Sequence, residues 1–287
     1  MSSSKKLIQA ASGVGGAGLD VDEVFSTFLY EGSSGTQLIT NGIDLSGEGG
    51  LTWFKRRNGS GDHQLFDSAR TGRYRLEANT TDAQADEGAT VWNTQSTGFY
   101  IGGDGGSQIY NSNGDDYVSW TFRKAPNFFD VQTWTGNGTA RAISHNLGSV
   151  PGMVIYKNVT SAFGWQVYHR GMAIDRRLEL AATDSASSSV GYWDQTTPVT
   201  STVLNIGTDA HVNNNGNNYV AYLFGHETDS DSMIQCGSYT GNGSSTGPTV
   251  TLGWQPQWLM VKSASDTNQD WYIIDTVRGF VSGGNDA

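Results

Sequence analysis

The sequence predicts an all-β protein made of tandem β-sandwich units of the jelly-roll or lectin-like kind. Three observations support this fold class. The 287 residues include 38 glycines but only 5 prolines, which is typical of many short strands joined by tight turns. Apolar and polar residues alternate in short segments, and no stretch has a convincing helical period. The third observation is an internal repeat with a period of 104 to 105 residues.

The repeat starts at an aromatic residue that precedes a Gly-rich turn. The three copies of this residue are Tyr30, Trp134 and Tyr239, and the lysine that ends a later apolar stretch recurs as Lys55, Lys157 and Lys262. Further stretches match, namely residues 65–67, 167–169 and 273–275, and residues 111–118 and 213–220. A period this long exceeds a solenoid turn or a propeller blade, so we expect units that each bury their own core and stack stiffly.

The spacing divides the chain into an arm and three units. Residues 1–24 form a flexible Gly-rich N-terminal arm, residues 25–128 and 129–232 form two complete units, and residues 233–287 form the first half of a third. Half a sandwich would expose its core face to water. We therefore expect the third unit to be truncated from a longer chain.

Two kinds of strand are expected within a unit. Residues 153–156 and 258–261 are short continuous apolar runs, each preceded by a proline, which favours strands covered on both faces. Residues 117–122 alternate, with Val118, Trp120 and Phe122 on one side. This alternation predicts a half-buried strand.

Composition and charge exclude several classes of function. The formal net charge of −11 would repel phosphate backbones and anionic lipid, so we expect neither nucleic-acid binding nor membrane insertion. No apolar run approaches the roughly 18 residues that span a bilayer. Cys236 is the only cysteine, which excludes an intrachain disulfide, and we interpret it as a small buried residue.

Motifs for catalysis are missing from the sequence, and we predict that the chain is not an enzyme and needs no cofactor. It has no phosphate-binding loop, no Gly-x-Ser-x-Gly elbow and no His-Glu-x-x-His. Asp67 and Arg70, like Asp275 and Arg278, share an Asp-x-x-Arg spacing, but the second unit has His169 there. A local ion pair that closes a turn explains this spacing better than a catalytic carboxylate.

Two sets of residues are weak binding candidates. Asn111, Asn113 and Asp115 alternate like the oxygen ligands of a calcium loop, but the bidentate glutamate typical of such loops is missing, so we predict a turn and no metal. Several tryptophans recur between units, Trp92 with Trp193 and Trp165 with Trp271, which indicates a shared structural role. Trp254 does not recur, since Ser149 stands at its position in the second unit, and it is the candidate for ligand binding.

Several phrases of the sequence resemble virion proteins of tailed bacteriophages, particularly marine ones. They lie at residues 24–35, 39–45, 49–55, 128–131, 145–152 and 235–243. Such proteins are described as structural, tail-fibre or tail-associated proteins. The resemblance covers nearly the whole chain after the arm and brings no catalytic residues with it.

The resemblance implies a structural protein of the virion, assembled in the bacterial cytoplasm. The leading expectation is a tail fibre or tail-associated protein that takes part in host attachment. A head fibre or capsid decoration protein, and a polysaccharide-degrading tailspike, are the alternatives. The arm would bind a tail or capsid protein, distal units would meet a host glycan or receptor, and the chain would form a homo-oligomer, perhaps a trimer as virion fibres often do.

Overall fold

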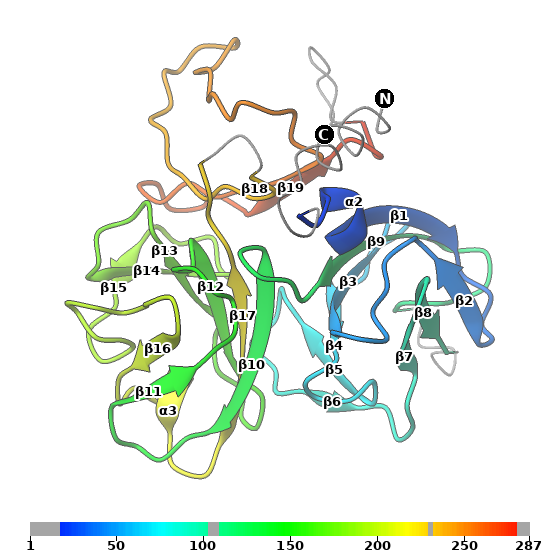
Figure 1. Ribbon diagram of the computed structural model, residues 1–287, viewed down its shortest axis with the longest axis horizontal. Coiled ribbons are helices and arrows are strands. Elements are labelled where there is room, and N and C mark those ends of the chain that lie inside the picture. Colours follow the sequence, from blue (N-terminus) through cyan, green and yellow to red (C-terminus); the bar gives the residue numbers. More distant parts are fainter. Residues whose placement is uncertain (1–17, 103–108, 229–231, 280–287) are drawn as a thin grey trace, which may run out of the picture.

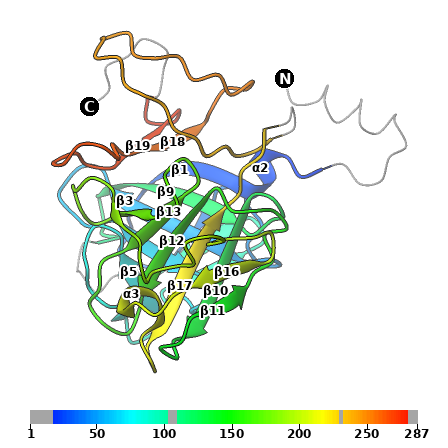
Figure 2. The same ribbon diagram turned by 90° about the vertical axis from the view of Figure 1, so that its left-hand side faces the viewer.

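The computed structural model describes residues 18–102, 109–228 and 232–279, and it confirms an all-β sandwich fold. Its helices in these residues are two four-residue turns, α2 (Val21–Val24) and α3 (Ala210–Asn213). All ladders between the named strands are antiparallel. Three lobes surround a common centre, with the first two units side by side and the third across one end of both (Figures 1 and 2).

Unit 1 is a sandwich of a large and a small sheet. The strand order of the large sheet is β1 (Phe25–Glu31), β9 (Asp116–Arg123), β3 (Gly50–Arg56), β4 (Gln64–Asp67), β5 (Tyr74–Glu77), β6 (Ala85–Asp86). The small sheet contains β2 (Gln37–Thr40), β8 (Gly98–Ile101) and β7 (Trp92–Gln95). Phe54 of the large sheet packs edge-on against Phe99 of the small one, so the two sheets enclose a local core.

Unit 2 repeats the large sheet strand by strand, and its small sheet has two strands instead of three. Its large sheet has the order β10 (Phe129–Thr135), β17 (Asn218–Phe224), β12 (Met153–Asn158), β13 (Gln166–His169), β14 (Arg176–Glu179), β15 (Ser187–Ser188). A pair of strands, β11 (Arg141–Ser144) and β16 (Val203–Ile206), covers one face. The last strand of each unit therefore lies between the first and the third.

The central strand is buried on both faces, which corrects the expectation of a half-buried strand. In β9, residues Tyr117 to Phe122 are all buried. Val118, Trp120 and Phe122 belong to the largest core of the molecule, whereas Thr121, on the other face, accepts a hydrogen bond from Asn41 beside the small sheet. Apolar and polar residues alternate along this strand because its two faces meet different surroundings. The shared core covers one face, and the small sheet covers the other.

Unit 3 contains a single hairpin of β18 (Trp258–Val261) and β19 (Tyr272–Asp275) among the described residues. By the repeat these strands correspond to β12 and β13. The corresponding residues of β12 are buried, but all four residues of β18 are only half-buried. The expectation that residues 258–261 are covered on both faces is therefore wrong for this unit.

One hydrophobic core joins all three units, so the expectation of separate beads is wrong. Phe122 is its clearest member: its ring packs on Phe25 of its own unit, Phe129 and Phe224 of unit 2, and Trp258 of unit 3. Each large sheet thus turns one face inward to the shared core and the other face to its own small sheet.

The predicted N-terminal arm is only partly described. Residues 18–24 belong to the described part, where α2 is capped by Asp20 and Glu23 and Val24 is fully buried in the shared core. The Gly-rich stretch before Gly18 lies outside the described residues. Val24 therefore packs with the units, not with an arm.

The shared core predicts that the three units unfold together. Phe122→Ala should lower the free energy of unfolding by about 3–5 kcal/mol, because it leaves a cavity where the units meet. Urea denaturation measures this loss, and hydrogen exchange should show lowered amide protection in β3, β12 and β18 alike. Tyr100→Ala, which removes a partly exposed aromatic ring from the small sheet, is the control. Loss of protection confined to unit 1 would contradict the prediction.

Candidate functional site

The seams between units contain several of the buried polar groups of the molecule. At the seam between units 1 and 2, the indole N–H of Trp165 donates to the carbonyl of Glu77 at 2.9 Å. The ammonium group of Lys157 donates to the carbonyl of Thr81, also at 2.9 Å. Burial lowers the pKa of Lys157 to about 8, since the charged form is costly away from water.

The seam between units 2 and 3 repeats these bonds one unit further along the chain. Trp271 donates to the carbonyl of Glu179 at 2.9 Å, and Lys262 donates to the carbonyl of Thr183 at 3.1 Å. These four residues occupy the repeat positions of the four at the first seam. The units are therefore related by the same step, and two such steps place unit 3 beside unit 1.

An aspartate at the end of β4 completes the first seam. The hydroxyl of Tyr222 in unit 2 donates to Asp67 Oδ2 at 2.7 Å, and Arg70 forms a buried ion pair with the same carboxylate at 2.7 Å. The sequence predicted a local ion pair here, and the structure adds the contact across the seam. Burial and the Asp67 charge raise the pKa of Tyr222, which keeps the hydroxyl protonated as a donor.

The matching contact closes the ring between units 3 and 1. The indole N–H of Trp120, at the repeat position of Tyr222, donates to Asp275 Oδ2 at 3.0 Å. The guanidinium group of Arg278 lies 4.9 Å from the Trp120 ring centre and donates to Asp275 at 2.6 Å. The three units therefore form a pseudo-threefold ring around the shared core.

Within the described residues, three positions of the ring lack the partner that their counterparts have. Lys55 corresponds to Lys157 and Lys262, and in this part of the chain its ammonium group donates to Gly61 O of its own unit. His63 stands at the position of the two seam tryptophans, and His169 at that of Asp67 and Asp275. Among the described residues, none of the three has a hydrogen-bond partner across a seam, and we call the part of the ring where they lie the open side.

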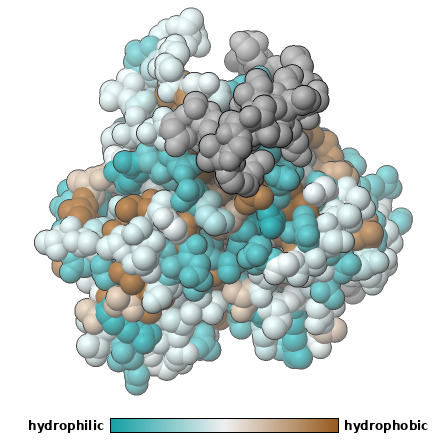
Figure 3. Space-filling model, in the orientation of Figure 1, coloured by the Kyte–Doolittle hydropathy of each residue, from teal (hydrophilic) through white to brown (hydrophobic). Residues whose placement is uncertain are grey.

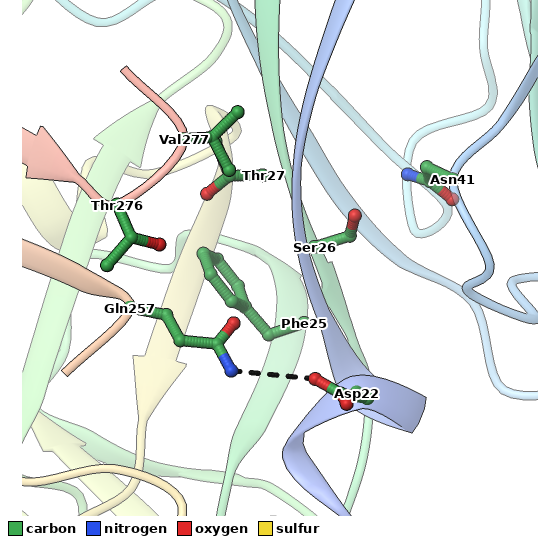
Figure 4. Close-up of a pocket in the computed structure, with 8 residues that line it drawn as sticks. All are labelled: Asp22, Phe25, Ser26, Thr27, Asn41, Gln257, Thr276 and Val277. Carbon is green, nitrogen blue, oxygen red and sulfur yellow. Dashed lines mark hydrogen bonds between the residues drawn. The ribbon is translucent and has the colours of Figure 1, made fainter. Parts of the chain in front are cut away.

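A small depression lies beside the open side, between β1 and unit 3 (Figure 4). Gln257 Nε2 donates to Asp22 Oδ1 at 3.5 Å, across its rim. Phe25 lies in the middle of the group, and Asn41 lies apart from it (Figure 4). The hydroxyl of Thr27 is buried without a hydrogen-bond partner. The described lining of the depression contains one carboxylate, that of Asp22, and no second titratable group.

On the open side, His63 is the titratable group whose pKa the fold shifts most. Its Nδ1 accepts a hydrogen bond from the indole N–H of Trp53 at 2.9 Å, and its ring stacks on Trp120. Burial, together with the nearby charges of Lys55 and Arg278, lowers the pKa of His63 to about 4. The imidazole is therefore neutral at pH 7.

The three calcium candidates do not converge on a common point. Asn111 Oδ1 accepts from Ser33 N and from Gln37 Nε2, and Asp115 forms an ion pair with Arg56 at 2.6 Å. Asn113 is exposed and bonds through its backbone to Ser34. No group of three or more His, Cys, Asp or Glu suited to a metal occurs in the described part of the chain.

The repeat explains the role of Asn111. Asn213, its counterpart, is also fully buried and bonds in the same way, since its Oδ1 accepts from Asn137 N and its Nδ2 donates to two carbonyls. Both asparagines fasten the turn after the first strand of their unit. Their spacing in the sequence reflects this turn.

Trp254 lies half-buried in the turn before β18. Its indole N–H is buried without a partner, but the residue lines neither the depression in Figure 4 nor a second one beside Glu48 and Lys124. The structure therefore does not bring Trp254 together with other binding groups.

Sequence reasoning missed the seam residues, although the repeat contained a signal for them. His63 and His169 interrupt positions that are Trp or Asp in the other units. Such interruptions fall where the ring is open.

Comparison with known families gives a single result. A model for a domain of unknown function, DUF7483, matches residues 20–285. The chain belongs to this family. The DUF7483 domain of this chain thus includes every described strand, from β1 to β19. Neither the curated proteins nor the solved structures contain a match to the chain.

Removal of the seam carboxylate should destabilise the protein strongly. Asp67→Ala leaves the Arg70 charge buried without its partner, which typically costs about 3–5 kcal/mol. Urea denaturation at pH 7 measures the change. The control is Asp86→Ala, which breaks an exposed pair with Arg73 and should leave the denaturation midpoint almost unchanged. Equal effects of the two substitutions would contradict a structural role for the seam.

His63 should make stability depend on pH between about 6.5 and 4. In this range the unfolded chain binds a proton that the folded chain does not, so stability falls as the pH falls, by up to about 3 kcal/mol. His63→Gln retains an acceptor for Trp53 without this titration. Urea denaturation at pH 7, 5.5 and 4.5 should therefore show a shallower pH dependence for the variant, and identical slopes would refute the assignment.

Proposed function

We propose that this protein is a non-enzymatic structural component of a tailed-bacteriophage virion, as a tail fibre or tail-associated protein that takes part in host attachment. The observation that carries the structural part is the ring of seams, in which buried polar and charged groups hold the units together. The phage part rests on the resemblance of the sequence phrases to virion proteins.

The buried carboxylates support a non-catalytic role. In the described part of the chain these are Asp67, Asp130 and Asp275, and each accepts hydrogen bonds from protein groups. A glycosidase needs one carboxyl group free to donate a proton and a second one facing it across a cleft. Carboxylates that bind arginine, tryptophan or backbone groups do not fit that role, which disfavours a polysaccharide-degrading tailspike.

The surface supports a role in protein assembly more than binding to nucleic acid or insertion into membranes. The face in Figure 3 shows apolar residues in small scattered groups, surrounded by polar ones. No helix among the described residues is long and apolar enough to cross a membrane. The net charge of −11 favours solubility and disfavours polyanionic partners.

Immunogold labelling of purified virions of the phage that encodes the chain tests the proposal. Gold particles at the tail are the expected result, and added recombinant protein should compete with virions for host adsorption. Labelling only on the capsid would replace the tail assignment with that of a head fibre or decoration protein. Release of reducing ends from host polysaccharide by the purified chain would overturn the non-enzymatic assignment.

A further inference from the structure

The small sheet of unit 1 has one exposed side. Strands β2, β8 and β7 lie on the part of unit 1 that points away from unit 2 (Figure 1). Their inward side chains, such as those of Ile39 and Phe99, are buried in the local core of the unit. On the opposite side, Leu38 is 43% exposed and Tyr100 is 39% exposed. An aliphatic and an aromatic side chain therefore face solvent together.

The strand register arranges this exposed side in two rows of three residues. Leu38, Tyr100 and Asn93 lie side by side across β2, β8 and β7, and the next row is Thr40, Gly98 and Gln95. We call these six residues the outer face. Neighbouring strands are about 4.8 Å apart and alternate residues of a strand about 6.7 Å apart, so the outer face covers on the order of 100 Å².

The polar side chains of the outer face are not used by the fold. Within the described residues, the side chains of Thr40, Asn93, Gln95 and Tyr100 form no hydrogen bond with another protein group. A side-chain amide has two donor hydrogens and an acceptor oxygen, and a hydroxyl group both donates and accepts. The outer face thus offers a ligand one aromatic ring beside two amides.

Unit 2 does not repeat this arrangement. Its small sheet has two strands, and Ala142 and Asn205 pair at the position of Leu38 and Tyr100. The Asn205 amide donates to the carbonyl of Thr197 at 2.7 Å, so it is bonded within its own unit. The shared fold therefore forms without an exposed tyrosine at this position, and the tyrosine of unit 1 is available for binding.

The outer face carries no charge. Residues 32–43 and 88–102, which contain its three strands, include no Asp, Glu, Lys or Arg, whereas 16% of the whole chain is charged. A phosphate, carboxylate or ammonium group bound there would find no side chain of opposite charge on the outer face. The composition therefore favours a neutral ligand that is rich in hydroxyl groups.

The area of the outer face decides between a small ligand and a protein partner. A stable protein interface buries about 800 Å² on each partner. Six residues that cover on the order of 100 Å² are too few for that, but they match one or two sugar rings. A second copy of the chain or another folded protein therefore fits the outer face less well than a sugar does.

We propose that the outer face binds a neutral glycan, with a sugar ring on Tyr100 and its hydroxyl groups bonded to the amides of Asn93 and Gln95. The negative face of an aromatic ring attracts the C–H groups on the flat side of a sugar ring. Amides match adjacent hydroxyl groups because they can donate to one and accept from the next. The proposal rests on the proposed function only for the source of the glycan, the host surface.

Binding by a single outer face is weak. Its hydrogen bonds replace bonds that both partners already make with water, so the net gain from each is small. Several copies of the chain on one particle would add their contacts through multivalency. The test on the isolated chain therefore needs a method that detects weak binding.

An NMR titration of the ¹⁵N-labelled 287-residue chain tests the proposal. The probes are neutral disaccharides built from glucose, galactose, mannose and N-acetylglucosamine. At least one of them should shift the side-chain NH₂ signals of Asn93 and Gln95 and the backbone amides of residues 98–101 in a saturable way. Disaccharides that contain a uronic acid should bind more weakly, because the outer face offers their carboxylate no cation.

Three variants give the test its specificity. Tyr100→Ala removes the ring and should weaken binding about five- to tenfold, whereas Tyr100→Phe keeps the ring and should retain most of it. Asn93→Ala should weaken binding about two- to tenfold, the loss of one hydrogen bond. Tyr239→Ala, which removes a tyrosine that is 56% exposed in unit 3, is the matched control and should leave binding unchanged.

Several outcomes would overturn the proposal. They are the absence of shifts with every neutral disaccharide, shifts confined to other strands, tighter binding of the uronic acid probes, and equal losses in Tyr100→Ala and Tyr239→Ala. A mass in analytical ultracentrifugation that doubles in the native chain and not in Tyr100→Ala would assign the outer face to a second copy instead. Immunogold labelling that fails to mark the virion would refute the virion assignment and would not alter the titration, so the two failures are distinguishable.

Discussion

The shared core at the centre of the ring is the constraint on which the rest of the structure depends. Each large sheet must be apolar on two faces, because one face meets the small sheet of its own unit and the other meets the neighbouring units. Phe122 contacts aromatic rings of all three units. A single hundred-residue unit taken alone would expose the inward face of its large sheet, so the units stabilise one another in a way that a string of beads does not.

The seams follow from this core. Where two units meet, the indole, ammonium and carboxylate groups that surround the core lose contact with water, and each must find a partner inside the protein. The structure satisfies them with the same bonds at successive seams, such as Trp165 to Glu77 and Trp271 to Glu179. Replacement of Trp by His63 and of Asp by His169 occurs on the open side, where the described residues offer no partner across a seam. The repeat is therefore most regular where the seam bonds form.

A ring of this kind suits a protein that must be rigid and must bind other proteins. Closed seams resist local opening, because the buried Asp67–Arg70 pair and the aromatic contacts would all have to separate together. Such rigidity agrees with the proposed role in an assembly, and the polar, acidic surface disfavours non-specific association.

Sequence alone determined the period, the all-β class and the identity of equivalent positions, because these depend on local alternation and on a repeat that can be read directly. It predicted that residues 153–156 form a strand covered on both faces, which the structure confirms. It also assigned the recurring tryptophans a structural role. It did not reveal that residues 117–122 are buried on both faces, since one-dimensional alternation cannot show that a second core covers the polar side.

Only the tertiary structure decided how the units meet. The decisive contacts, Tyr222 with Asp67 and Trp120 with Asp275, each join residues 155 positions apart, and nothing in either local segment specifies the other. A repeat fixes what each unit is but not the rotation between units, which the packing of the shared core sets. For the same reason the contacts of the Asn111 amide with Ser33 and Gln37 became visible only in the structure.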